Sequence, residues 1–199
     1  MKLYLSNISE ALPRHRELLT PERLQKADRY KMPDDKKRCV AGGVLLRHFL
    51  GDTRIMDNGY GKPIAENGPA FNLSHSGDWI ALAIGEDEVG CDIEKPKFVS
   101  YEKMGRIVFT ENELAKIRGA QDKMSAFFTL WTKKEALLKC MGKGFHRPGK
   151  SVDVSGDRFF DGEKCYFLKT VSFSDYVISA CAADSDFKLE IEFISLSKL

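Results

Sequence analysis

The sequence resembles itself at a distance of about half its length, and this repeat limits the folds that the chain can adopt. The stretch Asp78–Ala83 has the same pattern as Asp175–Ala180, 97 positions later, and Cys91–Glu94 matches Leu189–Glu192 at an offset of 98. The offset of 97 also aligns one predicted helix with another. We therefore expect an α+β fold of two similar α/β halves related by a pseudo-twofold axis, each with a small antiparallel sheet and a long helix. The alternative is that unrelated β-hairpins share this pattern by chance.

The boundary between the halves is expected at Lys95-Pro96-Lys97, because proline interrupts strand pairing. The N-terminal half is then residues 1–97 and the C-terminal half residues 98–199. Periodicity and end signals predict the elements. The expected strands are residues 1–8, Phe71–Ser76, Lys164–Val171, Tyr176–Ala182 and Lys188–Ile194, with Asp78–Gly85 and Val89–Glu94 forming a hairpin around residues 86–88. The expected helices begin at Thr20, span Asp34–Leu50, begin again after Thr110, with Glu113 completing a capping box, and span Ser125–Cys140, which Gly142-Lys143-Gly144 ends.

Composition excludes several classes of protein. The chain has 31 Lys and Arg against 29 Asp and Glu, a net charge of +2, so no overall field favours nucleic acid or a membrane surface. No run of about 18 apolar residues is present to span a bilayer. The five cysteines are scattered without a Cys-x-x-Cys pair, which argues against a disulfide framework and a zinc site. We expect a reduced, cytoplasmic, globular protein.

Two groups of carboxylates are candidates for a metal site. Asp92 and Glu94 are two positions apart on a predicted strand, so they share one face while Ile93 points into the core. Glu135 and Lys139 are four positions apart on a predicted helix and also share a face. Carboxylate oxygens are the ligands that Mg²⁺ prefers. The alternatives are solvated carboxylates at a strand end and a surface ion pair of little energetic value.

A third group of residues suits phosphate. Ser74-His75-Ser76 lies at the end of a predicted strand, after the glycine-rich loop that contains Lys62, and hydroxyl, imidazole and ammonium groups bind phosphate monoesters. A cationic stretch with Lys31 and Arg38 offers further phosphate contacts, or else a solvated helix face. The loop lacks the pattern of a P-loop, and no nucleophile elbow supports a serine hydrolase.

The order of these motifs is more specific than any single one. The chain carries in sequence Gly61-Lys62-Pro63, Asn72-Leu73-Ser74-His75-Ser76, Gly90-Cys91-Asp92-Ile93-Glu94, Phe109-x-x-x-Glu113 and Trp131-Thr132-Lys133-Lys134-Glu135-Ala136-x-x-Lys139. This series resembles the 4′-phosphopantetheinyl transferases of the Sfp-like subtype. The resemblance runs from about Arg38 to Gly144. It implies transfer of the 4′-phosphopantetheine arm of coenzyme A to a serine of an apo acyl or peptidyl carrier protein, with release of adenosine 3′,5′-bisphosphate.

The resemblance also implies a role for each site residue. Asp92, Glu94 and Glu135 would hold Mg²⁺, or Mn²⁺, on the pyrophosphate of coenzyme A, and Lys139 would contact the same pyrophosphate. Either Glu135 or Glu113 would take the serine proton. The residues that would bind the rest of coenzyme A are Ser74 and His75 on the 3′-phosphate, Lys62 and Pro63 in the nucleotide pocket, and Lys31 and Arg38 as further phosphate contacts.

Two other functions stay open at this point. A metal-dependent phosphodiesterase or nucleotide hydrolase would use the same carboxylates with water as nucleophile. A non-catalytic module would bind coenzyme A or a carrier protein without turnover. Lys133 and Lys134 are expected either to meet an acidic carrier helix or to be plain solvated lysines. The repeated position, with Glu190, Glu192 and Arg38, has an arginine in place of a metal ligand, so we expect one working site. Two halves that replace a dimer predict a monomer.

Overall fold

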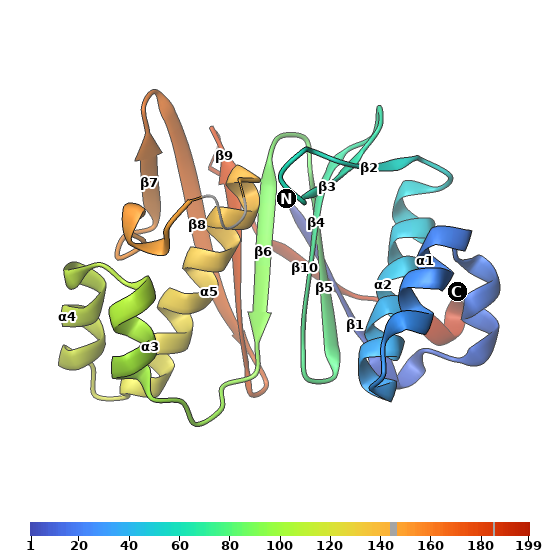
Figure 1. The fold of residues 1–199 in the computed structure, drawn as a ribbon. Helices are drawn as coiled ribbons and strands as arrows, with labels where there is room; N and C mark the ends of the chain where they lie inside the picture. The colour runs from blue at the N-terminus through green and yellow to red at the C-terminus, as the bar shows by residue number, and fades with distance from the viewer. Residues whose placement is uncertain (144–146, 185) are drawn as a thin grey trace.

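The computed structural model describes residues 1–143, 147–184 and 186–199, and Gly144 of the predicted helix stop lies outside them. Two four-stranded sheets form the middle of the molecule, and helices lie beside each of them (Figure 1). The fold is therefore mixed α and β, as predicted. The strands are β1 (Lys2–Asn7), β2 (Ile55–Asp57), β3 (Pro63–Ala65), β4 (Ala70–Ser76), β5 (Trp79–Gly85), β6 (Val89–Glu94), β7 (Arg158–Asp161), β8 (Lys164–Phe173), β9 (Tyr176–Ala183) and β10 (Glu190–Phe193). The α-helices are α1 (Pro21–Arg29), α2 (Pro33–Leu50), α3 (Tyr101–Val108), α4 (Glu111–Gly119) and α5 (Lys123–Met141).

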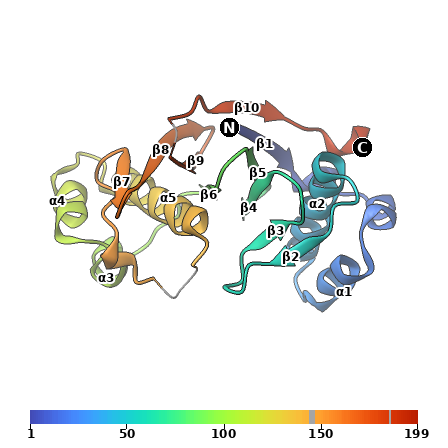
Figure 2. The ribbon, with the colours of Figure 1, turned by 90° about the horizontal axis from the view of Figure 1, so that it is seen from above.

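The first sheet has the strand order β10-β1-β5-β4. β5 pairs antiparallel with both β1 and β4, but β1 and β10 run parallel, with Leu3 opposite Ile191. The prediction of an antiparallel sheet is therefore wrong for this pair. The physical reason is the length of the connection, because only adjacent strands joined by a short turn are forced to be antiparallel. Figure 2 shows the chain crossing from β9 to lie along β1.

The second sheet has the order β6-β9-β8-β7 and is antiparallel throughout. The predicted hairpin of β5 with β6 is wrong, because β5 turns back on β4 and β6 pairs with β9. Gly90 explains the position of β6. A Cβ atom there would lie 2.1 Å from the carbonyl oxygen of Ala136, so only glycine lets the strand approach α5 this closely.

Local end signals set the helix boundaries as predicted. Thr20 caps α1 by accepting a hydrogen bond from Arg23 N. Thr110 and Glu113 form the reciprocal capping box of α4. α2 and α5 end at Gly51 and Gly142, both with positive φ. The α3 helix, the β2–β3 hairpin and β7, all short, were not predicted.

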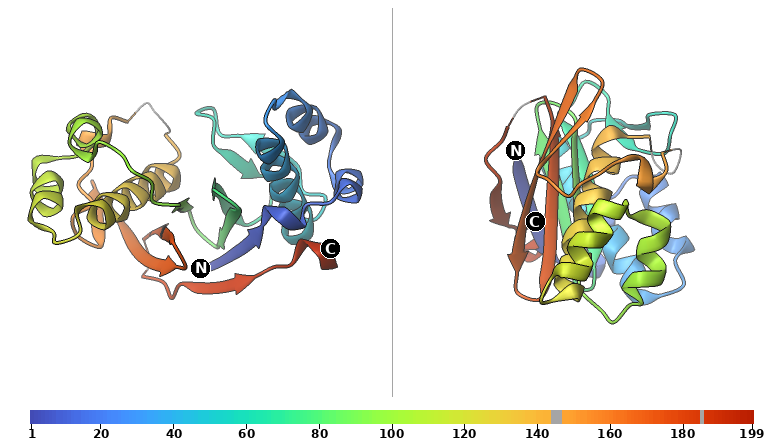
Figure 3. Two further views of the ribbon diagram at one scale, coloured as in Figure 1. Left: turned by 90° about the horizontal axis from the view of Figure 1, so that it is seen from below. Right: turned by 90° about the vertical axis from the view of Figure 1, so that its left-hand side faces the viewer.

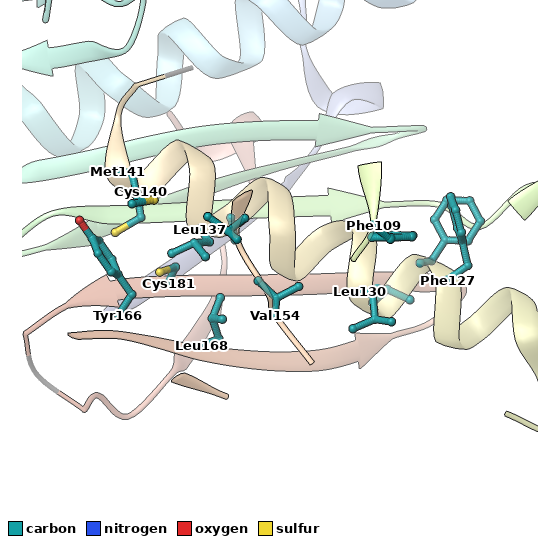
Figure 4. Packing of buried hydrophobic residues seen from close by; sticks show 14 of the residues in the cluster. Phe109, Phe127, Leu130, Leu137, Cys140, Met141, Val154, Tyr166, Leu168 and Cys181 are labelled. Atoms are coloured by element: carbon teal, nitrogen blue, oxygen red, sulfur yellow. The ribbon is translucent and has the colours of Figure 1, made fainter. Parts of the chain in front are cut away.

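The larger apolar clusters of the described residues hold these elements together. α2 packs on the first sheet, and α5 packs on the second, where Phe109, Leu137 and Leu168 are buried (Figure 4). A third cluster, with Leu5 and Ile93, lies between the sheets. No helix in the described part of the chain is long and apolar enough to cross a membrane. All five cysteines are free, which confirms the expectation of no disulfide framework.

Each half gives one strand to the sheet of the other half. β6 lies in the second sheet and β10 in the first (Figure 3). The sequence repeat aligns β5 with β9 and β6 with β10. β6 pairs directly with β9, but β1 lies between β10 and β5, so the two strand exchanges are not equivalent. The twofold relation, and the division into residues 1–97 and 98–199, stay predictions.

Candidate functional site

Alternation along β6 separates the core from the site. Ile93 is fully buried between the two sheets, and its neighbours Asp92 and Glu94 lie on the opposite face. Gly90, on the same face as these carboxylates, meets α5. Asp92 is buried and Glu94 half-buried. The predicted common face of the two carboxylates is confirmed, and it faces the helix that carries Glu135 and Lys139.

Asp92 is the centre of a small charged network. Its Oδ1 accepts hydrogen bonds from Ser74 Oγ at 2.8 Å and from Lys139 Nζ at 2.5 Å. Lys139 Nζ also donates to Ser74 Oγ at 3.1 Å. The other oxygen, Asp92 Oδ2, is buried and has no hydrogen-bond partner among the described residues. A buried carboxylate oxygen without a donor is free to accept a cation.

Burial disfavours the charged forms of the other two carboxylates, Glu94 and Glu135. Burial raises the pKa of Glu135, and the negative charges of Asp92 and Glu94 raise it further against the effect of Lys139. Burial also raises the pKa of Glu94, although its hydrogen bond from Ser76 lowers it. For Lys139, burial lowers the pKa, but the Asp92 carboxylate outweighs it and the pKa is raised. The three carboxylates therefore need more positive charge than Lys139 supplies.

The donor set suits a hard divalent cation in its chemistry. Asp92, Glu94 and Glu135 offer carboxylate oxygens, and Asp92 Oδ2 is unpaired. In the geometry described here, however, no group of three or more His, Cys, Asp or Glu side chains is arranged to hold a metal ion within residues 1–143, 147–184 and 186–199. Lys139 takes the place of a cation beside Asp92.

The predicted 3′-phosphate residues Ser74 and His75 point to opposite faces of β4. Ser74 points to β6 and Asp92, whereas Leu73 and His75 lie on the α2 side. Burial lowers the pKa of His75, and the nearby cations of Arg38 and Lys139 lower it further. In this structure the Ser74 hydroxyl and the His75 imidazole do not meet, because adjacent residues of a strand face opposite sides. Their joint contact with a 3′-phosphate stays a prediction.

The cationic stretch brings Arg38 to the end of β4. Its guanidinium donates twice to the carbonyl oxygen of Gly77, at 3.0 and 2.8 Å, and pairs with Asp35 at 2.7 Å. Lys31 is exposed before α2. His75 and Arg38 thus lie near each other on the side of β4 that faces away from Asp92, and Lys31 precedes the helix that carries Arg38.

Lys62 is placed at the other end of β6. Its ammonium donates to the carbonyl oxygens of Val89 and Cys140, both at 3.0 Å, and burial lowers its pKa. Pro63 begins β3 and is exposed. A cavity of about 370 Å³ opens here, lined among others by Lys62, Met141 and Gly142. Lys62 therefore joins the β2–β3 hairpin to the end of α5 and borders a cavity.

Glu113 and Lys134 form a buried ion pair far from solvent. Glu113 is 0 % exposed and accepts bonds from Lys134 Nζ at 2.6 Å, Val154 N at 2.7 Å and Thr110 N at 2.8 Å. With both oxygens bonded, it is a structural carboxylate, and its expected role as a base does not fit. Lys134 is 1 % exposed and Lys133 is bound to Asp157. The prediction that these lysines meet a carrier or are solvated is wrong, because both are buried.

From the sequence, Ser76 was considered only as part of the phosphate-binding group Ser74-His75-Ser76, and its contact with Glu94 was not predicted. Its hydroxyl donates to Glu94 Oε2 at 2.8 Å, just as Ser74 donates to Asp92. The two serine–carboxylate pairs share one sequence separation of 18 residues. The equal separation was the sequence signal that could have paired each serine with a carboxylate. It could be interpreted only once β4 and β6 were known to lie side by side.

Comparisons with known proteins all indicate the same family. A model of the 4′-phosphopantetheinyl transferase superfamily matches residues 88–181, which include β6 and α5. The chain is 30% identical over 203 residues to the 4′-phosphopantetheinyl transferase Sfp of Bacillus subtilis strain 168, covering 91% of this chain and 89% of the relative. It is 33% identical over 140 residues to the transferase gsp of Aneurinibacillus migulanus, covering 65% and 59%. It is 34% identical over 143 residues to the transferase HetI of a Nostoc strain, covering 63% and 60%.

Proposed function

This chain belongs to the 4′-phosphopantetheinyl transferase superfamily, as an Sfp-like member, and from that premise we propose that it transfers the 4′-phosphopantetheine arm of coenzyme A to a serine of an apo acyl or peptidyl carrier protein. The by-product is adenosine 3′,5′-bisphosphate. The observation that carries the proposal is the Asp92 network. It combines an unpaired buried carboxylate oxygen and the Lys139 ammonium with two further carboxylates, Glu94 and Glu135, whose pKa values burial raises.

The reaction exchanges one phosphorus–oxygen bond for another. The serine oxygen of the carrier bonds to the phosphorus that bears the pantetheine arm. The bond from that phosphorus to the bridging oxygen breaks, and its electron pair leaves with adenosine 3′,5′-bisphosphate. Lys139 donates hydrogen bonds to the negatively charged pyrophosphate, replacing its present contact with Asp92.

Glu135 accepts the serine proton in this scheme. Its pKa is raised in the metal-free protein, but a bound cation would lower it, so the role does not rest on that shift. Glu113 fits the role less well, because both of its oxygens already accept hydrogen bonds. Mg²⁺ or Mn²⁺, held by Asp92, Glu94 and Glu135, would neutralise charge on the pyrophosphate. A carboxylate has two oxygens, so Glu135 can contact a cation through one and take the proton through the other.

The rest of coenzyme A is assigned to cations of the first half. His75, with Arg38 and Lys31, supplies the charge for the 3′-phosphate on the far side of β4. Lys62 and Pro63 border the nucleotide pocket from the β2–β3 hairpin. The Ser74 hydroxyl donates to Asp92 in this structure, so a contact of Ser74 with the 3′-phosphate would require the hydroxyl to turn.

The carrier protein needs a docking surface other than Lys133 and Lys134. α3 and the segment before it expose apolar side chains, with Phe98 at 95% and Ile107 at 77% of their full area. The exposed cations Lys97 and Arg106 are their neighbours in the sequence. Exposed apolar side chains next to cations suit an acidic helix of a carrier.

The test is a mass measurement on the carrier itself. The pure protein is incubated with coenzyme A, Mg²⁺ and several apo carriers, and each carrier is weighed by intact mass spectrometry. A Mg²⁺-dependent gain of one phosphopantetheine arm supports the proposal. Cleavage of coenzyme A without any carrier gain would instead indicate a hydrolase, and tight binding with no cleavage a binding module.

The matched variants for this assay are Asp92→Asn and Glu163→Gln. Asp92→Asn removes the central charge and is expected to slow transfer roughly 100-fold or more, since several kcal/mol of charge stabilisation are lost. Glu163→Gln neutralises an exposed carboxylate in the turn between β7 and β8 and should leave the rate unchanged. Normal activity of Asp92→Asn would remove Asp92 from the site.

A further inference from the structure

The contact between the two sheets at the site is made by side chains of β4. β4 is an edge strand of the first sheet and β6 is an edge strand of the second. Three alternate residues of β4 accept hydrogen bonds from alternate backbone N–H groups of β6 and the residue after it. The pairs are Asn72 Oδ1 with Cys91 N at 2.9 Å, Ser74 Oγ with Ile93 N at 3.4 Å and Ser76 Oγ with Lys95 N at 3.1 Å.

The two serines of this series have a second contact that the asparagine lacks. Ser74 Oγ donates to Asp92 Oδ1 and Ser76 Oγ donates to Glu94 Oε2, each at 2.8 Å. A hydroxyl has one hydrogen to donate, and in both serines it goes to a carboxylate. Because each oxygen is also fixed by a backbone donor, the hydroxyl direction is set from both sides.

We propose that Ser76 is a positioning residue for Glu94, acting through a hydroxyl that is anchored on Lys95 N and aimed at Glu94 Oε2. Ser74 does the same for Asp92. The inference deepens the proposed function and rests on it, because it assumes that these carboxylates bind the divalent cation of the transferase.

The physical need for such residues is greatest at Glu94. Its side chain is longer than that of Asp92, and its only hydrogen bond from another side chain in the described part of the molecule comes from Ser76. Asp92, by contrast, is held by both Ser74 and Lys139. Asp92 and Glu94 repel each other on one strand face, so without Ser76 the Glu94 carboxylate would turn toward water. Hydrogen-bond partners of metal-binding carboxylates typically change metal affinity by about 10- to 100-fold.

The test measures Mn²⁺ binding in the absence of coenzyme A. Isothermal titration with Mn²⁺ is done on the wild-type protein, Ser76→Ala and Ser76→Thr. We expect roughly tenfold weaker binding in Ser76→Ala and near wild-type binding in Ser76→Thr, which keeps the hydroxyl. Ser172→Ala, an exposed serine on β8, is the matched control and should bind Mn²⁺ normally.

A second measurement tests the hydrogen bond from Lys95 N to Ser76 Oγ directly. Amide hydrogen exchange of Lys95 should speed up in Ser76→Ala and stay slow in Ser76→Thr, because only the alanine removes the acceptor of that N–H. In the transfer assay, Ser76→Ala should raise the Mg²⁺ concentration needed for half-maximal rate while most of kcat at saturating Mg²⁺ remains.

The outcomes separate this inference from the proposed function. Wild-type Mn²⁺ affinity in Ser76→Ala, failure of Ser76→Thr to restore binding, or absence of Mn²⁺ binding by the wild-type protein would each overturn the positioning role. If Mn²⁺ binding responds to Ser76 as expected but no carrier gains mass, the positioning role stands and the transferase proposal fails.

Discussion

At the scale of single residues, Glu135 makes the clearest link between burial and pH. Burial, together with the charges of Asp92 and Glu94, raises its pKa in the folded protein. The folded state therefore binds its proton more tightly than the unfolded state, and stability is lost as the pH rises from the ordinary pKa through the raised one. Above that range the charged Glu135 destabilises the metal-free protein.

We expect Glu135→Gln to stabilise the metal-free protein at neutral pH, by on the order of 1 kcal/mol or about 2–4 °C in Tm, while abolishing transfer. The gain should vanish near pH 4, where the carboxyl is protonated in both states. Thermal melts in EDTA between pH 4 and 8 measure this, with Glu163→Gln as control. A Tm gain that is equal at every pH would contradict the assignment.

His75 gives a second prediction at this scale. Burial and the charges of Arg38 and Lys139 lower its pKa, against the opposing effect of Asp35, so it is neutral over most of the working range. A phosphate dianion favours the imidazolium, so binding of coenzyme A takes up a proton and its affinity should fall as the pH rises. Calorimetry in buffers of different ionisation enthalpy measures the uptake. It should disappear in His75→Ala and with dephospho-coenzyme A, and its persistence in either would exclude a contact of His75 with the 3′-phosphate.

At the scale of elements, the packing of β6 on α5 depends on Gly90. A Cβ at this position would lie 2.1 Å from Ala136 O and 2.4 Å from Cys140 N, both backbone atoms that cannot turn away. We expect Gly90→Ala to destabilise the fold by about 3 kcal/mol or more, since backbone must shift to relieve the overlap. Chemical denaturation measures the loss. Gly119→Ala in α4 is the control, because a Cβ there meets nothing within 4 Å and alanine favours a helix. Equal stability of the two variants would show that the strand can move.

Helix ends could be predicted from the sequence, whereas strand partners could not. Thr20 and the Thr110–Glu113 capping box act within one turn of helix, so their roles were predicted from spacing alone. Alternation predicted the two faces of β6, but it carries no information about which strand becomes the neighbour. The β6–β9 pairing therefore had to come from tertiary contact. Lys134 was mistaken for a surface residue because its partner Glu113 is 21 positions away.

At the scale of the whole molecule, the site lies where the two sheets meet. Ser74 and Ser76 come from the first sheet, Asp92 and Glu94 from a strand that the first half gives to the second sheet, and Lys139 from α5. The exchanged strands β6 and β10 tie the halves together. Any relative shift of the two sheets would break the serine–carboxylate contacts and would also disturb the apolar cluster with Leu5 and Ile93 between the sheets.

This arrangement predicts that residues 1–97 and 98–199 cannot fold separately. The first fragment would carry β6 with its apolar face and no partner strand, and its sheet would lack β10. The second would expose the edge of β9 that pairs with β6 and the part of α5 that Gly90 approaches. We expect neither fragment to give a cooperative thermal transition alone, and co-expression of both to restore the transition together with transfer activity. Calorimetry on the separate and mixed fragments decides the matter, with the intact chain as control. A cooperative transition in either fragment alone would mean that the halves are independent domains and that strand exchange adds only to the site.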